Sequence, residues 1–182
     1  MSNLDELSSI ISDDIINLVK NSSLGNFNLP EDINDEIYYT VFDYDFSIDL
    51  DIKVSKEVSN YYIDFEFYRD SDEIYIVILL PNNKNKDYLS DIYHDLIEGV
   101  RHELEHVRQY VDGYEFSDEP EDHEQYYLQP HEIEALKSGF KHRANKENKS
   151  FESVVRKWFE SNTHRFKLNN KQIENIINTI IS

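Results

Sequence analysis

Two histidines and a glutamate at helical spacing are the residues of this chain best suited to chemistry. The segment His102-Glu103-Leu104-Glu105-His106 has the H-E-x-x-H pattern. Residues four apart lie nearly above one another on a helix, so His102 and His106 can reach a single metal ion. The pattern favours zinc, which imidazole nitrogens commonly bind. Glu103 lies about 100° further around the helix, where its carboxylate can move protons without binding the metal.

A hydrolytic zinc site also needs a third protein ligand and an open fourth position. Residues 130–135 offer three candidates, which are His131, Glu132 and Glu134. Glu132 shares its face of a predicted helix with apolar residues, whereas Glu134 shares its face with lysines. A ligand must point inward, so the helix geometry favours Glu132 over Glu134, and His131 is the least favoured of the three.

The two segments together, RHELEH followed by PHEIEAL, resemble the gluzincin branch of zinc metallopeptidases. The resemblance covers about residues 74–140, and the chain is also similar to short metallopeptidases predicted in phage genomes. It implies that His102, His106 and Glu132 bind one zinc ion per chain and that Glu103 is the general base. The implied activity is hydrolysis of peptide bonds, with zinc-bound water as the nucleophile.

The chain departs from the gluzincin pattern at two positions. Glu105 stands between the glutamate and the second histidine of the motif, where such enzymes usually have uncharged residues. Leu136 stands four residues after the predicted third ligand, where such enzymes often have an aspartate that orients a ligating histidine. Another carboxylate is therefore expected to orient the histidines.

The periodicity of apolar residues predicts the elements that carry this motif. A helix is predicted over residues 90–113, since its apolar residues recur at helical spacing. Before it, apolar residues at even positions from 38 to 54 alternate with aspartates and other polar residues. This alternation predicts one long strand, or two strands meeting at a bend, with a solvated acidic face. Residues 61–67 continue it, and the apolar segment 73–80 predicts a strand covered on both faces.

The order of these elements indicates an α+β fold. We expect a small antiparallel sheet packed on an active-site helix and a backing helix, a minimal zincin-like arrangement, with an N-terminal helix and a C-terminal helical extension. Residues 26–36 are expected to form a loop. Residues 1–145 would form the zincin-like domain with its N-terminal helix, and residues 146–182 a helical extension packed on the same domain.

The composition excludes several classes of function. The chain has 37 acidic residues against 18 Lys and Arg, a net charge of -19, which disfavours direct binding to nucleic acids and to anionic membranes. It has no cysteine, which excludes disulfides, thiol catalysis and cysteine-based metal sites. We find no signal peptide and no apolar run of about 20 residues, so a cytoplasmic protein is expected. The sequence does not indicate an oligomeric state.

An acidic loop over residues 115–124 separates the two metal motifs. If the loop faces the site, its charge predicts peptide or protein substrates with basic residues, because acidic groups beside a site attract cations. The alternative is a solvated loop that points away from the site. His123 lies in this loop, and Tyr126 and Tyr127 come directly after it. All three are candidates for the wall of the site, where a hydroxyl or imidazole could donate to an oxyanion.

The negative charge also supports an alternative from another functional class. The aspartates at positions 43, 45, 49 and 51 could imitate a phosphate backbone. The chain would then be an acidic binding or inhibitor protein that occupies a DNA-binding partner, with a structural or vestigial zinc site. The zinc content of the purified chain distinguishes the two functions.

Overall fold

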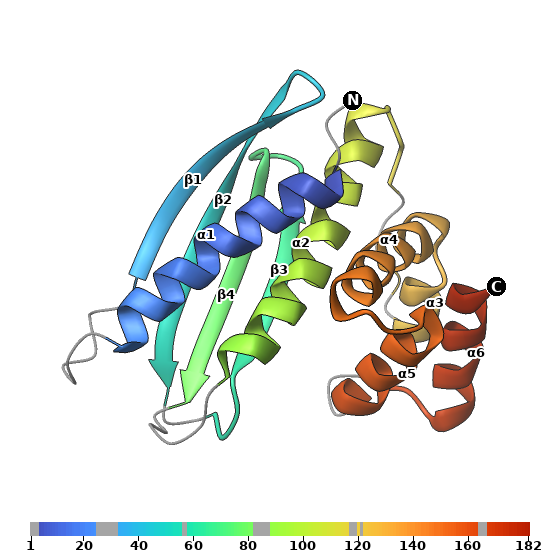
Figure 1. Cartoon of the computed structure of the whole chain (residues 1–182). Coiled ribbons are helices and arrows are strands. Elements are labelled where there is room, and N and C mark those ends of the chain that lie inside the picture. Colours follow the sequence, from blue (N-terminus) through green and yellow to red (C-terminus); the bar gives the residue numbers. More distant parts are fainter. Residues whose placement is uncertain are drawn as a thin grey trace.

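The computed structural model describes residues 4–24, 33–55, 58–81, 88–116, 120, 122–163 and 167–182. Within these residues the chain forms six helices and one four-stranded sheet (Figure 1). The predicted α+β class is confirmed, including the N-terminal helix and the helices that follow the sheet. None of the described helices is long and apolar enough to cross a membrane.

The sheet contains β1 (Ile33–Val41), β2 (Tyr44–Ser55), β3 (Tyr62–Tyr68) and β4 (Glu73–Pro81), in the order β1-β2-β4-β3. The expected loop over residues 26–36 therefore ends earlier, because β1 begins at Ile33. β4 pairs antiparallel with β3 but parallel with β2. The expectation of an antiparallel sheet is therefore wrong for the pairing of β2 with β4. β4 has the most continuous apolar sequence and takes an inner position, where both its edges are hydrogen-bonded.

The bend expected between two strands is a two-residue turn at Phe42 and Asp43. Both residues have positive φ, 54° and 59°, as in the type I′ turns that fit the twist of a hairpin. A two-residue turn pairs odd positions of β1 with even positions of β2, as in Tyr39 opposite Phe46. In β2 the even positions face the core, as expected. In β1 the odd positions face the core instead, so Tyr38, at an even position, is 71% exposed.

Two helices, α1 (Leu4–Leu24) and α2 (Leu89–Val111), lie across the same face of the sheet (Figure 1). The buried residues of β2 and β4 that face these helices form the main apolar core with them. β4 was expected to be covered on both faces. Its even-numbered residues and the last residue, Pro81, are buried, whereas Tyr75, Val77 and Leu79 on its other face are half-buried.

The acidic face of β2 is less solvated than its alternation predicts. Asp51 is only 4% exposed, because Lys53 pairs with its carboxylate and Tyr75 donates to it at 3.4 Å. The prediction of a solvated row of aspartates is therefore wrong at Asp51. It overlooked the long side chains on the same face of the sheet, which cover short neighbours.

The C-terminal part contains α3 (His123–Tyr127), α4 (Pro130–Glu147), α5 (Phe151–Asn162) and α6 (Asn170–Ile181). Pro130 begins α4, a position where the missing N–H costs no hydrogen bond. Asn148 ends α4 in the left-handed conformation. The apolar side of α4 forms a second core with α5 and α6. The predicted division between residues 145 and 146 falls inside α4 and stays a prediction.

α2 and α4 approach closely at Gly139. A Cβ added there would lie 2.7 Å from the backbone oxygen of Glu98, so a larger residue would push the helices apart. This close crossing brings the first turn of α4 beside the H-E-x-x-H motif of α2.

Candidate metal site

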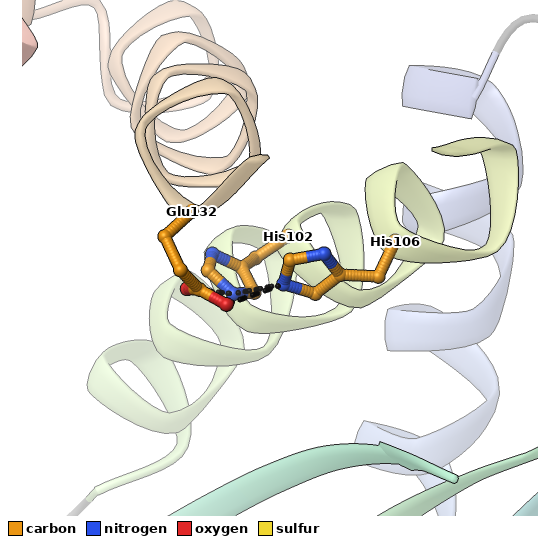
Figure 2. A group of neighbouring side chains, drawn as sticks. All are labelled: His102, His106 and Glu132. Carbon is orange, nitrogen blue, oxygen red and sulfur yellow. Dashed lines mark hydrogen bonds and ion pairs between the residues drawn. The ribbon is translucent and has the colours of Figure 1, made fainter. Parts of the chain in front are cut away.

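Three predicted ligands from two helices meet at one point (Figure 2). His102 and His106 extend from adjacent turns of α2, and their Nε2 atoms are 3.1 Å apart. Glu132 reaches them from the first turn of α4. Its Oε1 lies 3.3 Å from Nε2 of His106, and its Oε2 lies 3.6 Å from Nε2 of His102. This group could hold a metal ion.

The spacing of the two histidine nitrogens fits tetrahedral coordination. Ligand atoms about 2.0–2.1 Å from a tetrahedral ion are separated from one another by about 3.3 Å. The histidine nitrogens are 3.1 Å apart, one oxygen of Glu132 lies 3.3 Å from His106, and its other oxygen lies 3.6 Å from His102. Two imidazoles and one carboxylate are a donor set that suits zinc and neighbouring transition metals.

Gln109 orients the second histidine. Its side-chain nitrogen donates to the backbone oxygen of His131 and to Glu134, both at 3.1 Å, so its oxygen must face the other way. Nδ1–H of His106 donates to that oxygen at 2.9 Å, which directs Nε2 toward the other donors. A carboxylate was expected in this role and an amide provides it. The three-residue spacing from His106 is the signal in the sequence that could have identified it.

Protons and a metal would compete for this donor group. Burial disfavours a charged His106, but the hydrogen bond and charge of Glu132, together with the charge of Glu103, raise the pKa of His106 to about 9. Burial acts to raise the pKa of Glu132, but the histidines outweigh it and lower that pKa to about 2. Burial and the charge of His106 lower the pKa of His102 to about 3. His106 therefore carries the proton that a metal would replace.

Glu103 lies beside the donor group without belonging to it. Its side chain is buried, and its Oε1 is 3.8 Å from Nε2 of His102. Burial raises the pKa of Glu103 to about 7 despite the opposing charge of His106. A carboxyl group with this pKa exchanges protons readily at neutral pH, as a general base and acid must.

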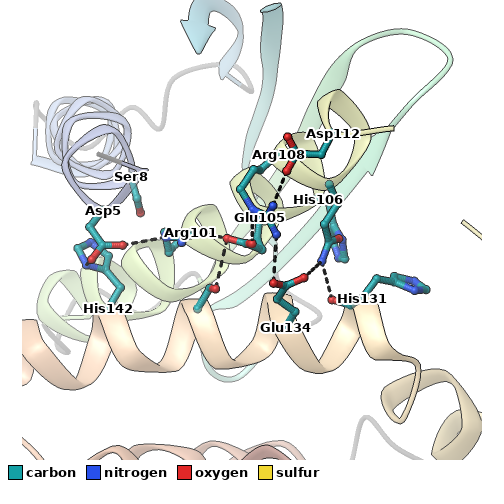
Figure 3. Close-up of polar contacts among 12 residues, drawn as sticks. Asp5, Ser8, Arg101, Glu105, His106, Arg108, Asp112, His131, Glu134 and His142 are labelled. Carbon is teal, nitrogen blue, oxygen red and sulfur yellow. Dashed lines mark hydrogen bonds and ion pairs between the residues drawn. The ribbon is translucent and has the colours of Figure 1, made fainter. Parts of the chain in front are cut away.

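Glu105, the first departure from the gluzincin pattern, is buried on another face of α2. It accepts hydrogen bonds from Arg101 at 2.7 Å and Arg108 at 2.6 Å, and a weaker one from Ser138 at 3.3 Å (Figure 3). These arginines outweigh the effect of burial and lower the pKa of Glu105. Arg101 also binds Asp5 of α1 at 2.8 Å. Glu105 is therefore part of a group of ion pairs that links α2 to α1.

The two alternative ligands lie outside the donor group. The Glu134 side chain is 56% exposed and pairs with Arg108 at 3.1 Å. His131 is buried next to the group, with its Nε2 3.6 Å from Oε1 of Glu132, and its Nδ1 lies 3.4 Å from the Tyr114 hydroxyl. The inward direction predicted for Glu132 is confirmed, while its role as a ligand stays a prediction.

The donor group opens into a cleft of about 640 Å³. β3 and α2 line one side of it, and α3, α4 and α5 line the other. His123, Tyr126 and Tyr127 all line the cleft, where they were expected. Burial, together with the nearby carboxylate of Glu132, raises the pKa of Tyr126.

Comparisons of the chain with protein-family models, curated proteins and solved structures gave no match. The gluzincin resemblance therefore rests on the two motifs and stays a hypothesis. The acidic loop that was expected to attract basic substrates is described only in part, because residues 117–119 and 121 lie outside the described residues.

Proposed function

We propose that this protein is a zinc-dependent peptidase in which His102, His106 and Glu132 hold the ion. The observation that carries this proposal is the convergence of His102, His106 and Glu132 with Glu103, a buried carboxyl group whose Oε1 lies 3.8 Å from Nε2 of His102. Among the described residues Glu103 has no Lys or Arg partner, unlike the other buried glutamates of α2. When bound, zinc would supply Lewis acidity that activates a water molecule and polarises a substrate carbonyl.

The residues around the donors have roles that suit peptide hydrolysis. Glu103 would accept a proton at the start of the reaction and return it to the leaving amine. Gln109 would keep His106 in the tautomer that binds a metal. β3 is an edge strand of the sheet and its residues 62–65 line the cleft, so an extended peptide could add to the sheet as a further strand beside it.

The experiment compares Glu103→Gln with Glu134→Gln, a matched change at an exposed position near the site. Each chain is purified without chelator, its zinc is measured by mass spectrometry, and hydrolysis of a quenched fluorescent peptide library is recorded. We expect one zinc ion per chain in all three proteins. Hydrolysis should fall by about 10²–10⁴-fold in Glu103→Gln only, the usual contribution of a general base.

Two outcomes would contradict the proposal in different ways. A zinc-loaded wild-type chain that cleaves no peptide would refute the peptidase activity and support the metal site. A chain without zinc, even after incubation with it, would remove both and favour the alternative of an acidic binding protein.

A further inference from the structure

The sheet has one face that none of the described helices covers. α1 and α2 lie across the opposite face, and the C-terminal helices gather beside α2 (Figure 1). Successive residues of a strand point to opposite faces, so every second residue of each strand belongs to the uncovered side. We call this side the outer face. It consists of the even-numbered residues of β1 and β3 and the odd-numbered residues of β2 and β4.

One row across the outer face holds three acids and a tyrosine. The register pairs Glu36 of β1 with Asp49 of β2 and Asp49 with Tyr75 of β4, and Tyr75 in turn lies opposite Glu66 of β3. Neighbouring strands are about 4.8 Å apart, so the row spans about 15 Å. None of its three carboxylates forms an ion pair within the described part of the chain. Burial and the charges of acidic neighbours raise the pKa of Asp49, as expected where negative charges gather.

A buried carboxylate oxygen on the same face lacks a hydrogen-bond donor. Oδ2 of Asp51 pairs with Lys53 and accepts a hydrogen bond from Tyr75, whereas its Oδ1 is buried and has no hydrogen-bond partner among the described residues. Lys53 is also the one cation that the described chain contributes to the outer face. A buried acceptor without a donor is unfavourable, so a donor from outside the chain would find a partner here once a long neighbouring side chain turned aside.

Tyrosines give the outer face an apolar component. Tyr38 is 71% exposed and Tyr68 is 41% exposed, and the rings of Tyr68 and Tyr75 are 6.4 Å apart. Val77 and Leu79, both half-buried, continue this surface along β4. Aromatic rings beside carboxylates suit guanidinium groups, which can stack on the ring and pair with the carboxylate at the same time.

We propose that the outer face docks a protein partner whose own surface presents rows of Arg and Lys side chains, of the kind that otherwise contacts a nucleic-acid backbone. The charge of the face selects this occupant. A second copy of the chain would bring the same acids, and the phosphates of nucleic acids or membranes would be repelled.

This inference gives the alternative of an acidic binding protein a defined surface. It replaces the predicted row of aspartates in β2 with acids and tyrosines from all four strands. It does not depend on the proposed zinc site, whose ligands lie on α2 and α4.

The test uses two designed β-hairpin peptides of equal composition as probes of such a basic surface. One carries all its arginines on a single face, and the other carries them on both faces. Binding to the full chain is measured by fluorescence anisotropy at physiological salt, after circular dichroism has verified that each variant is folded. The outer-face variant has Glu36→Gln, Asp49→Asn and Glu66→Gln. The matched control has Glu6→Gln, Asp35→Asn and Glu160→Gln, three exposed acids outside the outer face.

We expect the hairpin with arginines on one face to bind about tenfold more tightly than the other, and to lose about tenfold in affinity in the outer-face variant only. Tyr38→Ala should weaken binding about threefold, while Ile10→Ala, at an exposed position of α1, should not. Equal affinity of the two hairpins would overturn the inference, and so would an equal loss in the control variant, which would indicate net charge alone. Sedimentation that detected a dimer sensitive to Tyr38→Ala would identify a second copy as the occupant and overturn it as well.

Discussion

Glu103 and Glu105 are two residues apart on α2, are both buried, and have opposite electrostatic surroundings. Glu105 lies between Arg101 and Arg108, which hold its pKa below the usual value. Glu103 has no such partner among the described residues, and burial raises its pKa to about 7. Among the described residues, arginines thus pair with Glu105, whereas none pairs with Glu103 beside the donor group.

The same contrast occurs on α4. Glu134 is mostly exposed and pairs with Arg108, whereas Glu132 is buried and faces two histidines. The charge that balances Glu132 is a proton on His106, whose pKa is raised to about 9. A metal ion can replace this exchangeable proton and balance the charge of the buried carboxylate, which supports the proposed zinc site.

The largest effect is expected when Glu132 and Glu134 of α4 are replaced one at a time. We expect Glu132→Ala to lower zinc affinity more than about a hundredfold, because a lost ligand costs more than a lost outer partner. Glu134→Ala should change it little, since the polar partners of that side chain within the described residues are Arg108 and Gln109 and not the donor group. Competition with a fluorescent zinc indicator gives both affinities, and similar losses in the two variants would refute the assignment.

Gln109 should have the next largest effect. Gln109→Ala removes the acceptor for Nδ1–H of His106, so zinc affinity should fall by about 10–100-fold. Gln125→Ala, at an exposed position of α3, is the matched control and should leave the affinity unchanged. The same indicator competition applies, and an unchanged affinity in Gln109→Ala would show that the histidine is oriented in some other way.

The proton on His106 predicts a pH dependence of zinc binding. His106 must lose a proton with a pKa of about 9, so affinity should rise about tenfold per pH unit from 7 toward 9 and then level off. Glu132, with a pKa of about 2, and His102, with a pKa of about 3, are already deprotonated and add nothing. Calorimetry in buffers of different ionisation enthalpy should detect about one proton released at pH 7.5. A flat profile would contradict the competition between proton and metal.

The smallest effect is expected on the other face of α2. Glu105→Gln should lower the free energy of unfolding by about 1 kcal/mol in urea denaturation, because Arg108 is partly exposed and water screens the pair. The pKa of Glu105 is lowered in the folded chain, so its stabilisation is present above the ordinary value of 4.5 and lost as pH falls further. The difference between wild type and variant should therefore disappear in acid. Loss of zinc in this variant would show that the two faces are not independent.

The features predicted correctly depend on spacing within one element. Helical spacing places His102 and His106 on one side of α2, and the apolar neighbours of Glu132 direct it inward from α4. The two-residue alternation of β2 likewise follows from the geometry of a single strand. Such patterns persist in the folded chain because burying an apolar face is favourable whichever partner covers it.

Other features depend on which elements become neighbours, and sequence spacing does not contain that information. β4 inserts between β2 and β3 and makes the sheet mixed. Glu105 is buried because α1 and α4 both pack near it, and Gln109 is oriented by acceptors that α4 supplies. The sequence by itself determined the donor types and the helix faces that carry them. Only the packing of α4 on α2 decided that Glu132 meets the two histidines, because these contacts join residues distant in the chain.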